Sequence, residues 1–322
     1  MRTIAIAAGG NSSEFGISVK SATEVFNALS SRYIVYIVMI RGSDWYWEDQ
    51  KGQYHNLDKN DFTLSTDDLK IRFDAVFIAI HGTPGENGLL QGYFDMIKIP
   101  YSSCDAFCSA LTFNKQACKL FLKEYDIPMA ESVLIRKKEN FDAAGIIKRI
   151  GLPCFVKPND SGSSFGVTKV KKKGEMNAAI EKAFKESDEV LAEAFMNGRE
   201  VACGVLKTKS ADIILPVTEI ISKNEFFDYE AKYTSGKSDE ITPARLPGPV
   251  TEEIQSLSSK VYDILGCRGI VRVDFIVIGD KPYFLEINTV PGMTEESLVP
   301  KEAMAAGIKF SDLCSMVIED LF

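Results

Sequence analysis

The chain has 322 residues, of which 45% are hydrophobic and 25% are charged, and its formal net charge is −8. This length predicts two or three domains with real cores, and the composition argues against disorder. The negative charge disfavours a nucleic-acid partner. No segment approaches the ~18 apolar residues of a membrane span, and the apolar start at residues 1–10 is too brief for a signal-peptide core, so we expect a cytoplasmic protein without a membrane partner.

Cysteine and histidine usage limits the redox and metal chemistry. The cysteines are odd in number, scattered and without a CxxC spacing, which favours reduced core thiols over disulfides and over zinc. They are Cys104, Cys108, Cys118, Cys154, Cys203, Cys267 and Cys314. Because His55 and His81 are the only histidines, a histidine-rich metal site is excluded and a histidine-based catalytic triad is disfavoured.

The first third of the chain alternates between strands and helices. Apolar segments predict strands over residues 3–8, 34–40 and 75–80. A helix is predicted from Ile17, and residues 43–70 indicate a polar surface excursion that contains strands. This order is typical of a parallel α/β layer. The loops at 9–14 and 81–88 follow predicted strands, and open α/β sheets bind ligands at the carboxyl ends of strands.

Two further units follow. Residues 114–125 predict a helix, and strands from residue 152 with a helix at 175–185 indicate a smaller α+β unit. A third unit contains a long polar loop at 224–248 and a helix at 251–265. We therefore predict three domains: 1–108, 109–199 and 200–322.

The segment 159–166 has the composition of an anion-binding loop. It follows a predicted strand that contains Lys157, and its small residues free backbone N–H groups to cradle anionic oxygens. The residues after it keep β character, whereas a Walker loop opens a helix, so we expect this loop to cap a hairpin. A plain hairpin turn is the alternative. Residues 190–196 predict a strand that either holds a nucleotide base or is a simple core strand.

The segment 266–294 predicts a β-hairpin with polar groups gathered on one face. Because alternate side chains of a strand point to opposite faces, Arg272 shares a face with Asp274, and Glu286 shares one with Asn288 on the return strand. The side chains expected on the other face are those of Val271, Val273, Phe275, Val277, Leu285 and Ile287.

The turn sets the register of this hairpin. A three-residue turn at 279–281 pairs Ile278 with Pro282. Two pairs then lie directly opposite each other: Asp274 with Glu286, and Arg272 with Asn288.

This register indicates a metal site. Carboxylates that face each other across a sheet repel, so the pairing calls for a cation. An oxygen cluster of Asp274, Glu286 and Asn288 suits Mg²⁺, which takes one or two carboxylates and fills its shell with substrate phosphates. The alternative is the solvated face of an edge hairpin, which we rank lower because such faces usually mix Lys and Glu with Thr.

Several segments, in this order, resemble the D-alanine–D-alanine ligase family of ATP-grasp enzymes. They are GGNSSE at 9–14, HGTPGENGLLQG at 81–92, VKPNDSGSSFGV at 156–167, DYEAKY at 228–233, RVDF at 272–275, EINTVPGMT at 286–294 and SLVP at 297–300. The resemblance spans nearly the whole chain. It implies a three-domain ATP-grasp fold, in which an N-terminal parallel α/β domain precedes two α+β domains that clasp ATP.

The resemblance also implies a nucleotide site. The ATP phosphates are contacted by Lys115, Lys157 and Lys232. The loop 162–166, which includes Ser164, closes over them. Adenine and ribose are held by Glu193, the backbone of Ala194 and Met196, and Glu200. Two Mg²⁺ or Mn²⁺ ions are bound by Asp274, Glu286 and Asn288, and K⁺ is a candidate further ion.

By the same resemblance, Glu14 binds the ammonium group of the first D-alanine and forms a triad with Ser163 and Tyr233 that orders mobile loops. His81 lies near this subsite.

The second subsite follows in the same way. Arg272 and the backbone N–H of Gly292 stabilise the developing oxyanion, and Ser297 and Leu298 anchor the carboxylate of the second D-alanine.

The implied reaction is ATP-dependent joining of two D-alanines through an acyl phosphate, for peptidoglycan precursor synthesis, in a homodimeric cytoplasmic enzyme. A D-alanyl-D-lactate or D-alanyl-D-serine ligase is the nearest alternative, disfavoured because Lys232 and Tyr233 are intact. Two others are a different ATP-grasp carboxylate–amine ligase and a nucleotide-binding regulatory module without catalysis. The retained Arg272 argues against the last, because a binding module needs no oxyanion donor.

Overall fold

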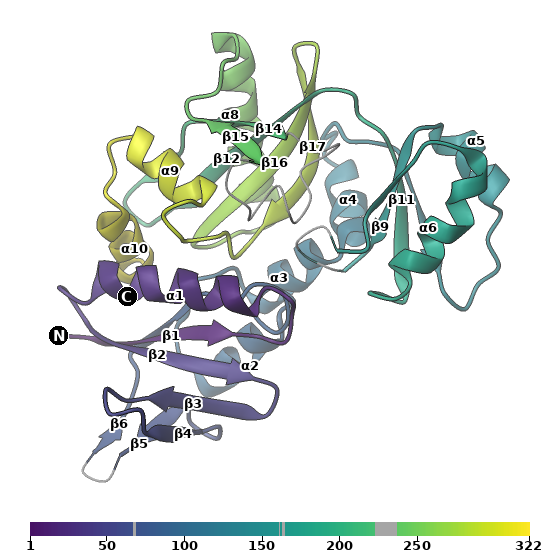
Figure 1. Ribbon diagram of the computed structural model, residues 1–322. Helices are drawn as coiled ribbons and strands as arrows, with labels where there is room; N and C mark the ends of the chain where they lie inside the picture. Colours follow the sequence, from purple (N-terminus) through teal and green to yellow (C-terminus); the bar gives the residue numbers. More distant parts are fainter. Residues whose placement is uncertain (67–68, 161, 163–164, 223–236) are drawn as a thin grey trace.

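The computed structural model describes residues 1–66, 69–160, 162, 165–222 and 237–322. Within these residues three sheets form the framework. Figure 1 shows the first sheet at the bottom, the third above it and the second to the side. The arrangement confirms the predicted combination of an N-terminal α/β layer with two α+β units.

The first sheet has the strand order β6-β5-β4-β3-β2-β1-β7. The predicted parallel layer is present, because β1 pairs in parallel with β2 and with β7. The strands predicted within 43–70 extend it as antiparallel hairpins. The strands are β1 (Thr3–Gly9), β2 (Ile34–Arg41), β3 (Asp44–Glu48), β4 (Tyr54–Asp58), β5 (Thr63–Ser65), β6 (Lys70–Ile71) and β7 (Ala75–Ile78).

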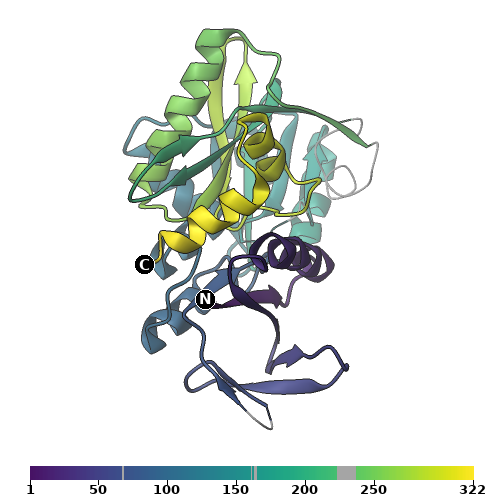
Figure 2. The same ribbon diagram turned by 90° about the vertical axis from the view of Figure 1, so that its left-hand side faces the viewer.

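Helices cover both faces of this sheet because β1 is apolar on both. Ile4 and Ile6 belong to the core cluster that includes residues of α1 and α10, whereas Ala5 and Ala7 belong to the cluster that includes Phe94 of α2. The helices are α1 (Phe15–Leu29), α2 (Leu89–Ile97), α3 (Ala106–Phe113) and, from the end of the chain, α10 (Phe310–Glu319). The termini consequently lie side by side, with Arg2 paired to Glu319 (Figure 1, Figure 2).

The second sheet, of order β10-β9-β11-β8, carries the predicted anion loop. Because β9 and β10 pair antiparallel, they form the two strands of the predicted hairpin; residues 161, 163 and 164 between them lie outside the described residues. The strands are β8 (Ser132–Arg136), β9 (Cys154–Pro158), β10 (Thr168–Val170) and β11 (Glu189–Ala194). The helices of this region are α4 (Lys115–Lys123), α5 (Ala143–Ile150), η1 (Lys173–Glu175) and α6 (Met176–Ala183).

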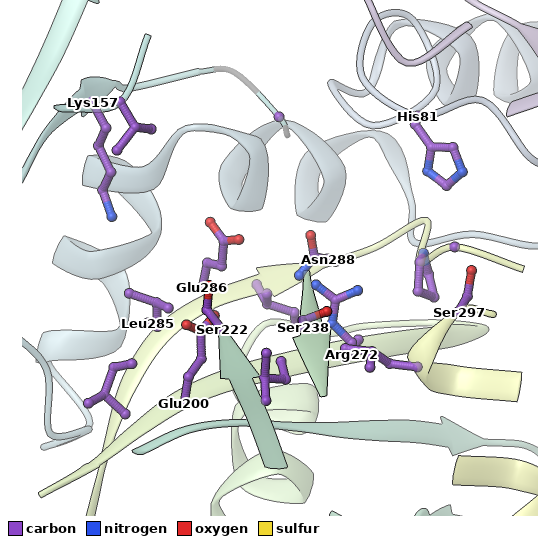
Figure 3. Close-up of a pocket in the computed structure, with 18 of the residues that line it drawn as sticks. His81, Lys157, Glu200, Ser222, Ser238, Arg272, Leu285, Glu286, Asn288 and Ser297 are labelled. Atoms are coloured by element: carbon purple, nitrogen blue, oxygen red, sulfur yellow. The ribbon is translucent and has the colours of Figure 1, made fainter. Parts of the chain in front are cut away.

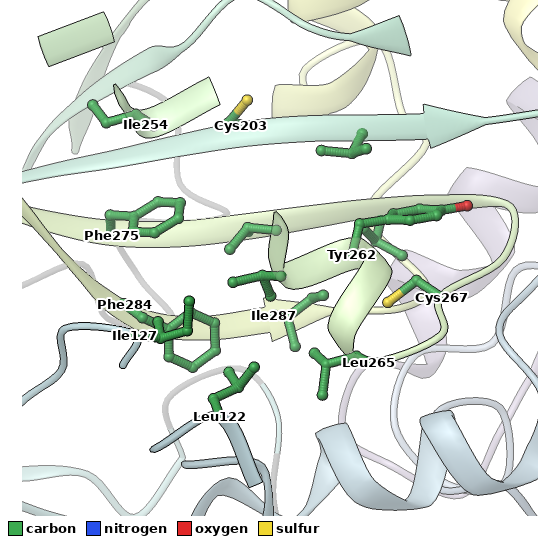
Figure 4. Packing of buried hydrophobic residues seen from close by; sticks show 14 of the residues in the cluster. Leu122, Ile127, Cys203, Ile254, Tyr262, Leu265, Cys267, Phe275, Phe284 and Ile287 are labelled. Carbon is green, nitrogen blue, oxygen red and sulfur yellow. The ribbon is translucent and has the colours of Figure 1, made fainter. Parts of the chain in front are cut away.

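The third sheet has the order β15-β14-β12-β16-β17, with β13 paired to β12. One expectation fails, because part of the predicted loop 224–248 is a strand that pairs with β14; residues 224–236 of that loop lie outside the described residues. The elements are β12 (Arg199–Lys207), β13 (Asp212–Ile214), β14 (Thr218–Ser222), β15 (Ser238–Ile241), α8 (Gly248–Ile264), β16 (Ile270–Ile278), β17 (Lys281–Asn288) and α9 (Leu298–Ala305). Figure 4 shows Phe275, Phe284 and Ile287 within one cluster of buried hydrophobic residues.

The hairpin β16–β17 confirms the predicted pairs but not the predicted turn. Ile278 pairs with Lys281 rather than with Pro282, so the loop has two residues, and Gly279 takes the positive φ of +61° that so tight a loop favours.

A β-bulge restores the predicted register beyond the turn. The register shifts between Asp274 and Phe275, so that Leu285 is an extra residue on β17. Asp274 therefore faces Glu286, as predicted. The bulge also reverses the expected direction of Leu285, which lines a cavity beside Glu286, while Ile287 stays in the core (Figure 3).

No helix among the described residues has the length and apolarity needed to span a membrane.

The turn between α8 and β16 makes a close contact with Ser102, in the segment between α2 and α3. Gly269 has a φ of +64°, and a Cβ built there would lie 2.0 Å from the Ser102 carbonyl oxygen. Gly266, in the same turn, has a φ of +65° but open space around its Cβ position.

We predict that Gly266→Ala costs roughly 1 to 2 kcal/mol, the usual penalty of a left-handed backbone. Gly269→Ala should cost about 1 to 3 kcal/mol more, because Cβ also overpacks against a backbone oxygen. Urea unfolding of both variants measures the difference. Equal losses of stability would show that the Ser102 contact relaxes freely.

Candidate active site

A cavity of about 1790 Å³ opens where the three sheets meet. In the view of Figure 3, Glu286, Asn288 and Arg272 lie between Lys157 and His81. The predicted site residues that line the cavity are Glu14, His81, Lys115, Lys157, Glu193, Ala194, Met196, Glu200, Arg272, Glu286, Asn288, Gly292, Ser297 and Leu298. Asp274, the remaining predicted residue that the structure describes, is buried and does not itself line the cavity. Four others, Ser163, Ser164, Lys232 and Tyr233, lie outside the described residues.

Arg272 and Asp274 form a bidentate ion pair on one face of β16. Nε and Nη2 of Arg272 donate to Oδ1 and Oδ2 of Asp274, each at 2.7 Å, and Nδ2 of Asn288 donates to Oδ2 of Asp274 at 3.0 Å. Burial alone would lower the pKa of the Arg272 guanidinium, but attraction and hydrogen bonds from Asp274, with further attraction from Glu286, raise it above its ordinary value. The guanidinium therefore stays charged.

The ion pair of Arg272 with Asp274 weakens one argument for a metal ion at the hairpin. Asp274 faces Glu286 across the hairpin, but Arg272 already supplies a positive charge beside it, so the facing carboxylates do not by themselves require a metal ion. The donor set still fits one. Two carboxylates and an amide on adjacent strands offer the oxygen ligands that Mg²⁺ prefers.

Lys157 and Glu193 belong to a buried network that also contains Lys119, which the sequence reasoning missed. Lys157 Nζ donates to Oε2 of Glu193 at 2.6 Å, and Lys119 Nζ donates to Oε1 of the same carboxylate and to the Ala130 carbonyl. Side-chain exposure is 11% or less for all three. Lys119 follows Lys115 by four residues on a helix, a spacing that could have placed it on the same face.

The network sets the protonation of its members. Burial raises the pKa of Glu193, but the two lysines outweigh it and hold this pKa below its ordinary value. Burial lowers the pKa of Lys157, but attraction from Glu193 and Glu286 leaves it raised. For Lys119 burial prevails, and its pKa is lowered. With all three ionised, the network carries one positive charge in excess, which suits an anionic ligand.

His81 joins the first sheet to the loop that contains Gly292. Its Nδ1 lies 3.0 Å from the Val290 carbonyl, so this nitrogen donates, and its Nε2 lies 3.3 Å from Ser21 Oγ. Ser21 in turn accepts from the Met293 N–H at 3.3 Å. Burial lowers the pKa of His81 despite the nearby Glu14. A neutral imidazole thus helps to position the loop, and Ser21, on α1, is a second residue that the sequence reasoning missed.

Glu14 lies under the anion loop. Its side chain is buried, and a Cβ built at Gly162 would lie 2.6 Å from Glu14 Oε2, which shows how closely Gly162 approaches this carboxylate. Glu86, unpredicted, accepts from the Gly82 N–H at 2.7 Å. Burial and the charge of Glu14 raise the pKa of Glu86 to about 8.

The far end of the cavity is formed by the start of α9. Ser297 is the N-cap residue, and its Oγ lies 2.8 Å from Thr294 Oγ1 and 3.2 Å from the Thr294 nitrogen. Gly292 packs against it, since a Cβ there would lie 2.6 Å from Ser297 Oγ. A helix N-terminus with backbone N–H groups directed outward favours a carboxylate.

Glu302 of α9 is fully buried behind this end of the cavity. The sequence reasoning also missed this residue, because no motif in the sequence marks it. Its Oε2 accepts from the Gly204 N–H at 2.7 Å, while Oε1 has no hydrogen-bond partner among the described residues. Burial raises the pKa of Glu302 to about 8, against the opposing charge of Arg272.

Two family models match the chain. Residues 3–104 match the model described as D-ala D-ala ligase N-terminus, and residues 121–319 match D-ala D-ala ligase C-terminus. A protein of Phocaeicola vulgatus named D-alanine–D-alanine ligase is 51% identical over 323 residues, covering 100% of this chain and 99% of its own length.

Solved structures agree. The VanG D-Ala:D-Ser ligase of Enterococcus faecalis superimposes with a TM-score of 0.87 at 33% identity, over 100% of this chain and 99% of its own. The D-alanine–D-alanine ligase of Bacillus anthracis complexed with ATP gives 0.80 at 29% identity, over 100% and 97%.

We predict an asymmetry within the lysine–glutamate network. Glu193→Gln leaves two buried ammonium groups without a counter-charge and should cost ~3 to 5 kcal/mol of unfolding free energy. Lys119→Met should cost less, because Glu193 keeps Lys157 as its partner. The double variant Lys119→Met/Glu193→Gln should be more stable than Glu193→Gln alone, since one unpaired charge is gone. Urea unfolding without nucleotide measures all three, and a Glu193→Gln loss no larger than that of Lys119→Met would contradict the charge balance.

Proposed function

Because the chain belongs to the D-alanine–D-alanine ligase family, we propose that it joins two D-alanines into D-alanyl-D-alanine for peptidoglycan synthesis, converting ATP to ADP and phosphate. One observation carries the proposal. A single cavity brings together Lys115 and Lys157, the oxygens of the β16–β17 hairpin, Arg272 and the start of α9. Cationic groups for phosphates and a helix N-terminus for a carboxylate thus share one cavity.

The first step transfers the γ-phosphoryl group of ATP to the carboxylate of the first D-alanine and releases ADP. Lys115 and Lys157 neutralise phosphoryl charge, as cations do in other phosphoryl transfers. Glu14 holds the ammonium group of this D-alanine. The roles predicted for the residues outside the described part of the chain are kept in this proposal. The triad with Glu14 contains Ser163 and Tyr233, the phosphate loop contains Ser164, and the third lysine at the phosphates is Lys232.

In the second step, the amine of the second D-alanine attacks the carbonyl carbon of the acyl phosphate, loses a proton and expels phosphate. Arg272 and the Gly292 N–H stabilise the oxyanion that develops on the carbonyl oxygen. Ser297 and Leu298, at the start of α9, hold the carboxylate of this second D-alanine.

The remaining assignments are proposed on the same basis. Asp274, Glu286 and Asn288 hold two Mg²⁺ or Mn²⁺ ions, which neutralise phosphate charge when bound, and K⁺ is a candidate activator. Adenine and ribose lie near Glu193, Ala194, Met196 and Glu200, beside Lys169 and Phe195, which form a cation–π contact at 3.9 Å. We further propose three domains at 1–108, 109–199 and 200–322, a homodimer, and cytoplasmic localisation, where ATP is supplied.

The first experiment measures ATP- and Mg²⁺-dependent phosphate release with D-alanine, L-alanine, D-serine, and D-alanine plus D-lactate, with mass spectrometry of the products. We expect turnover with D-alanine and D-alanyl-D-alanine as the product. If the chain preferred D-serine or D-lactate to D-alanine as the second substrate, it would be a D-alanyl-D-serine or D-alanyl-D-lactate ligase instead. This alternative matters because a similar structure is named a D-Ala:D-Ser ligase. ATP binding without turnover of any substrate would favour the regulatory module.

Arg272→Lys tests the oxyanion role while keeping a positive charge beside Asp274. Turnover should fall by roughly 10²- to 10³-fold, the usual effect of removing one oxyanion donor, with ATP affinity nearly unchanged. Steady-state kinetics and equilibrium ATP binding separate the two effects. Arg32→Lys, in a surface pair with Asp312, is the matched control and should change neither. Turnover that survives Arg272→Lys would overturn the assignment.

A further inference from the structure

Three cysteines meet at the junction between the first and third sheets, outside the active-site cavity. Cys104 precedes α3, Cys108 lies in its first turn, and Cys267 lies in the turn between α8 and β16. Their sulfurs all lie within 4.8 Å of one another, and those of Cys108 and Cys267 are 3.8 Å apart. All three residues are buried and none is in a disulfide.

The spacing matches that of sulfurs around a metal ion. An ion bonded to thiolates at ~2.3 Å separates its sulfurs by roughly 3.8 Å in tetrahedral geometry and roughly 4.0 Å in trigonal geometry. The cluster therefore needs little movement to close on an ion. Its donors are all sulfur, a set that selects soft ions and disfavours Mg²⁺, which prefers oxygen.

Neighbouring groups already orient these sulfurs. The Arg268 N–H donates to Cys104 Sγ at 3.4 Å, and the Cys108 N–H donates to Asp105 Oδ1 at 2.9 Å, which fixes the first turn of α3. The Arg268 guanidinium lies 3.5 Å from the other oxygen of Asp105, so the two charges beside the cluster offset each other. Hydrogen bonds and charges of this kind orient and tune the ligands of metal sites.

The cluster is also reachable. Cys267 lies between the exposed residues Gly266 and Arg268, so it is one residue beneath the surface of a turn. On its inner side it adjoins Tyr262 and Leu265, as Figure 4 shows. An ion can thus enter from the turn and be held against an apolar wall that excludes water.

We propose that Cys104, Cys108 and Cys267 bind one soft, thiophilic metal ion. Each thiol that coordinates loses its proton to solvent as its bond to the ion forms, and no electron is transferred. The bound ion ties the start of α3 to the turn that leads into β16, the strand of Arg272 and Asp274. Its effect is on stability, because an ion that binds the folded chain more tightly than the unfolded chain raises the midpoint of unfolding.

The test titrates Cd²⁺ alone into the full chain, reduced with a phosphine that does not compete for metal. We expect a thiolate-to-cadmium charge-transfer band that saturates at one ion per chain, and a rise in Tm. Cys104→Ser, Cys108→Ser and Cys267→Ser should each weaken the affinity by more than about 100-fold, since loss of a ligand should exceed the roughly 10- to 100-fold effect of an outer-shell group. The matched controls Cys154→Ser and Cys314→Ser alter buried thiols in other clusters and should leave binding unchanged.

A second measurement on the unaltered chain does not depend on variants that fold. X-ray absorption at the cadmium edge should show three sulfur neighbours per ion. Three results would overturn the proposal. The absorption spectrum could show only oxygen and nitrogen neighbours, or the number of cadmium ions bound per chain could rise with the total number of cysteines. The charge-transfer band could also persist in both Cys108→Ser and Cys267→Ser. A fully reduced chain that takes up no cadmium would also overturn it.

Discussion

The ion pair of Arg272 with Asp274 is the interaction on which the rest of the site depends. Both oxygens of Asp274 are engaged by one guanidinium in a buried setting, where the cost of desolvating two charges is offset only by close geometry. A metal ion held by Asp274, as proposed, would compete for those same oxygens. Asp274 would then hold the Arg272 guanidinium less tightly, and the guanidinium would be available to an anionic substrate.

Two groups of charged residues around the cavity differ in their net charge. The Lys119–Glu193–Lys157 network carries one positive charge in excess, whereas the hairpin carries Asp274 and Glu286 against Arg272. Phosphates suit the first, and cations suit the second. The proposed nucleotide and metal ions would thus complete each other's sites, which would account for so many charged groups around one cavity.

The sequence predicts the faces of the hairpin but not its bulge. Alternation placed Arg272 with Asp274 correctly, because the period of a strand is local. It could not reveal that a two-residue loop and an extra residue at Leu285 offset each other, since that depends on how the strands twist and pack. Three residues were missed for a related reason. Each lies on a helix, and tertiary packing decides which groups its side chain contacts; the residues are Lys119, Ser21 and Glu302.

The cluster of Cys104, Cys108 and Cys267 could not be predicted from the sequence either. Spacing rules for metal ligands assume that donors lie close together in the chain, and Cys108 and Cys267 are 159 residues apart. They meet because the turn before β16 packs tightly on the segment that leaves the first sheet, where Gly269 leaves no room for a Cβ beside the Ser102 oxygen. The same close approach that demands a glycine thus brings Cys267 to Cys104 and Cys108, so the junction and the thiol cluster are one structural feature.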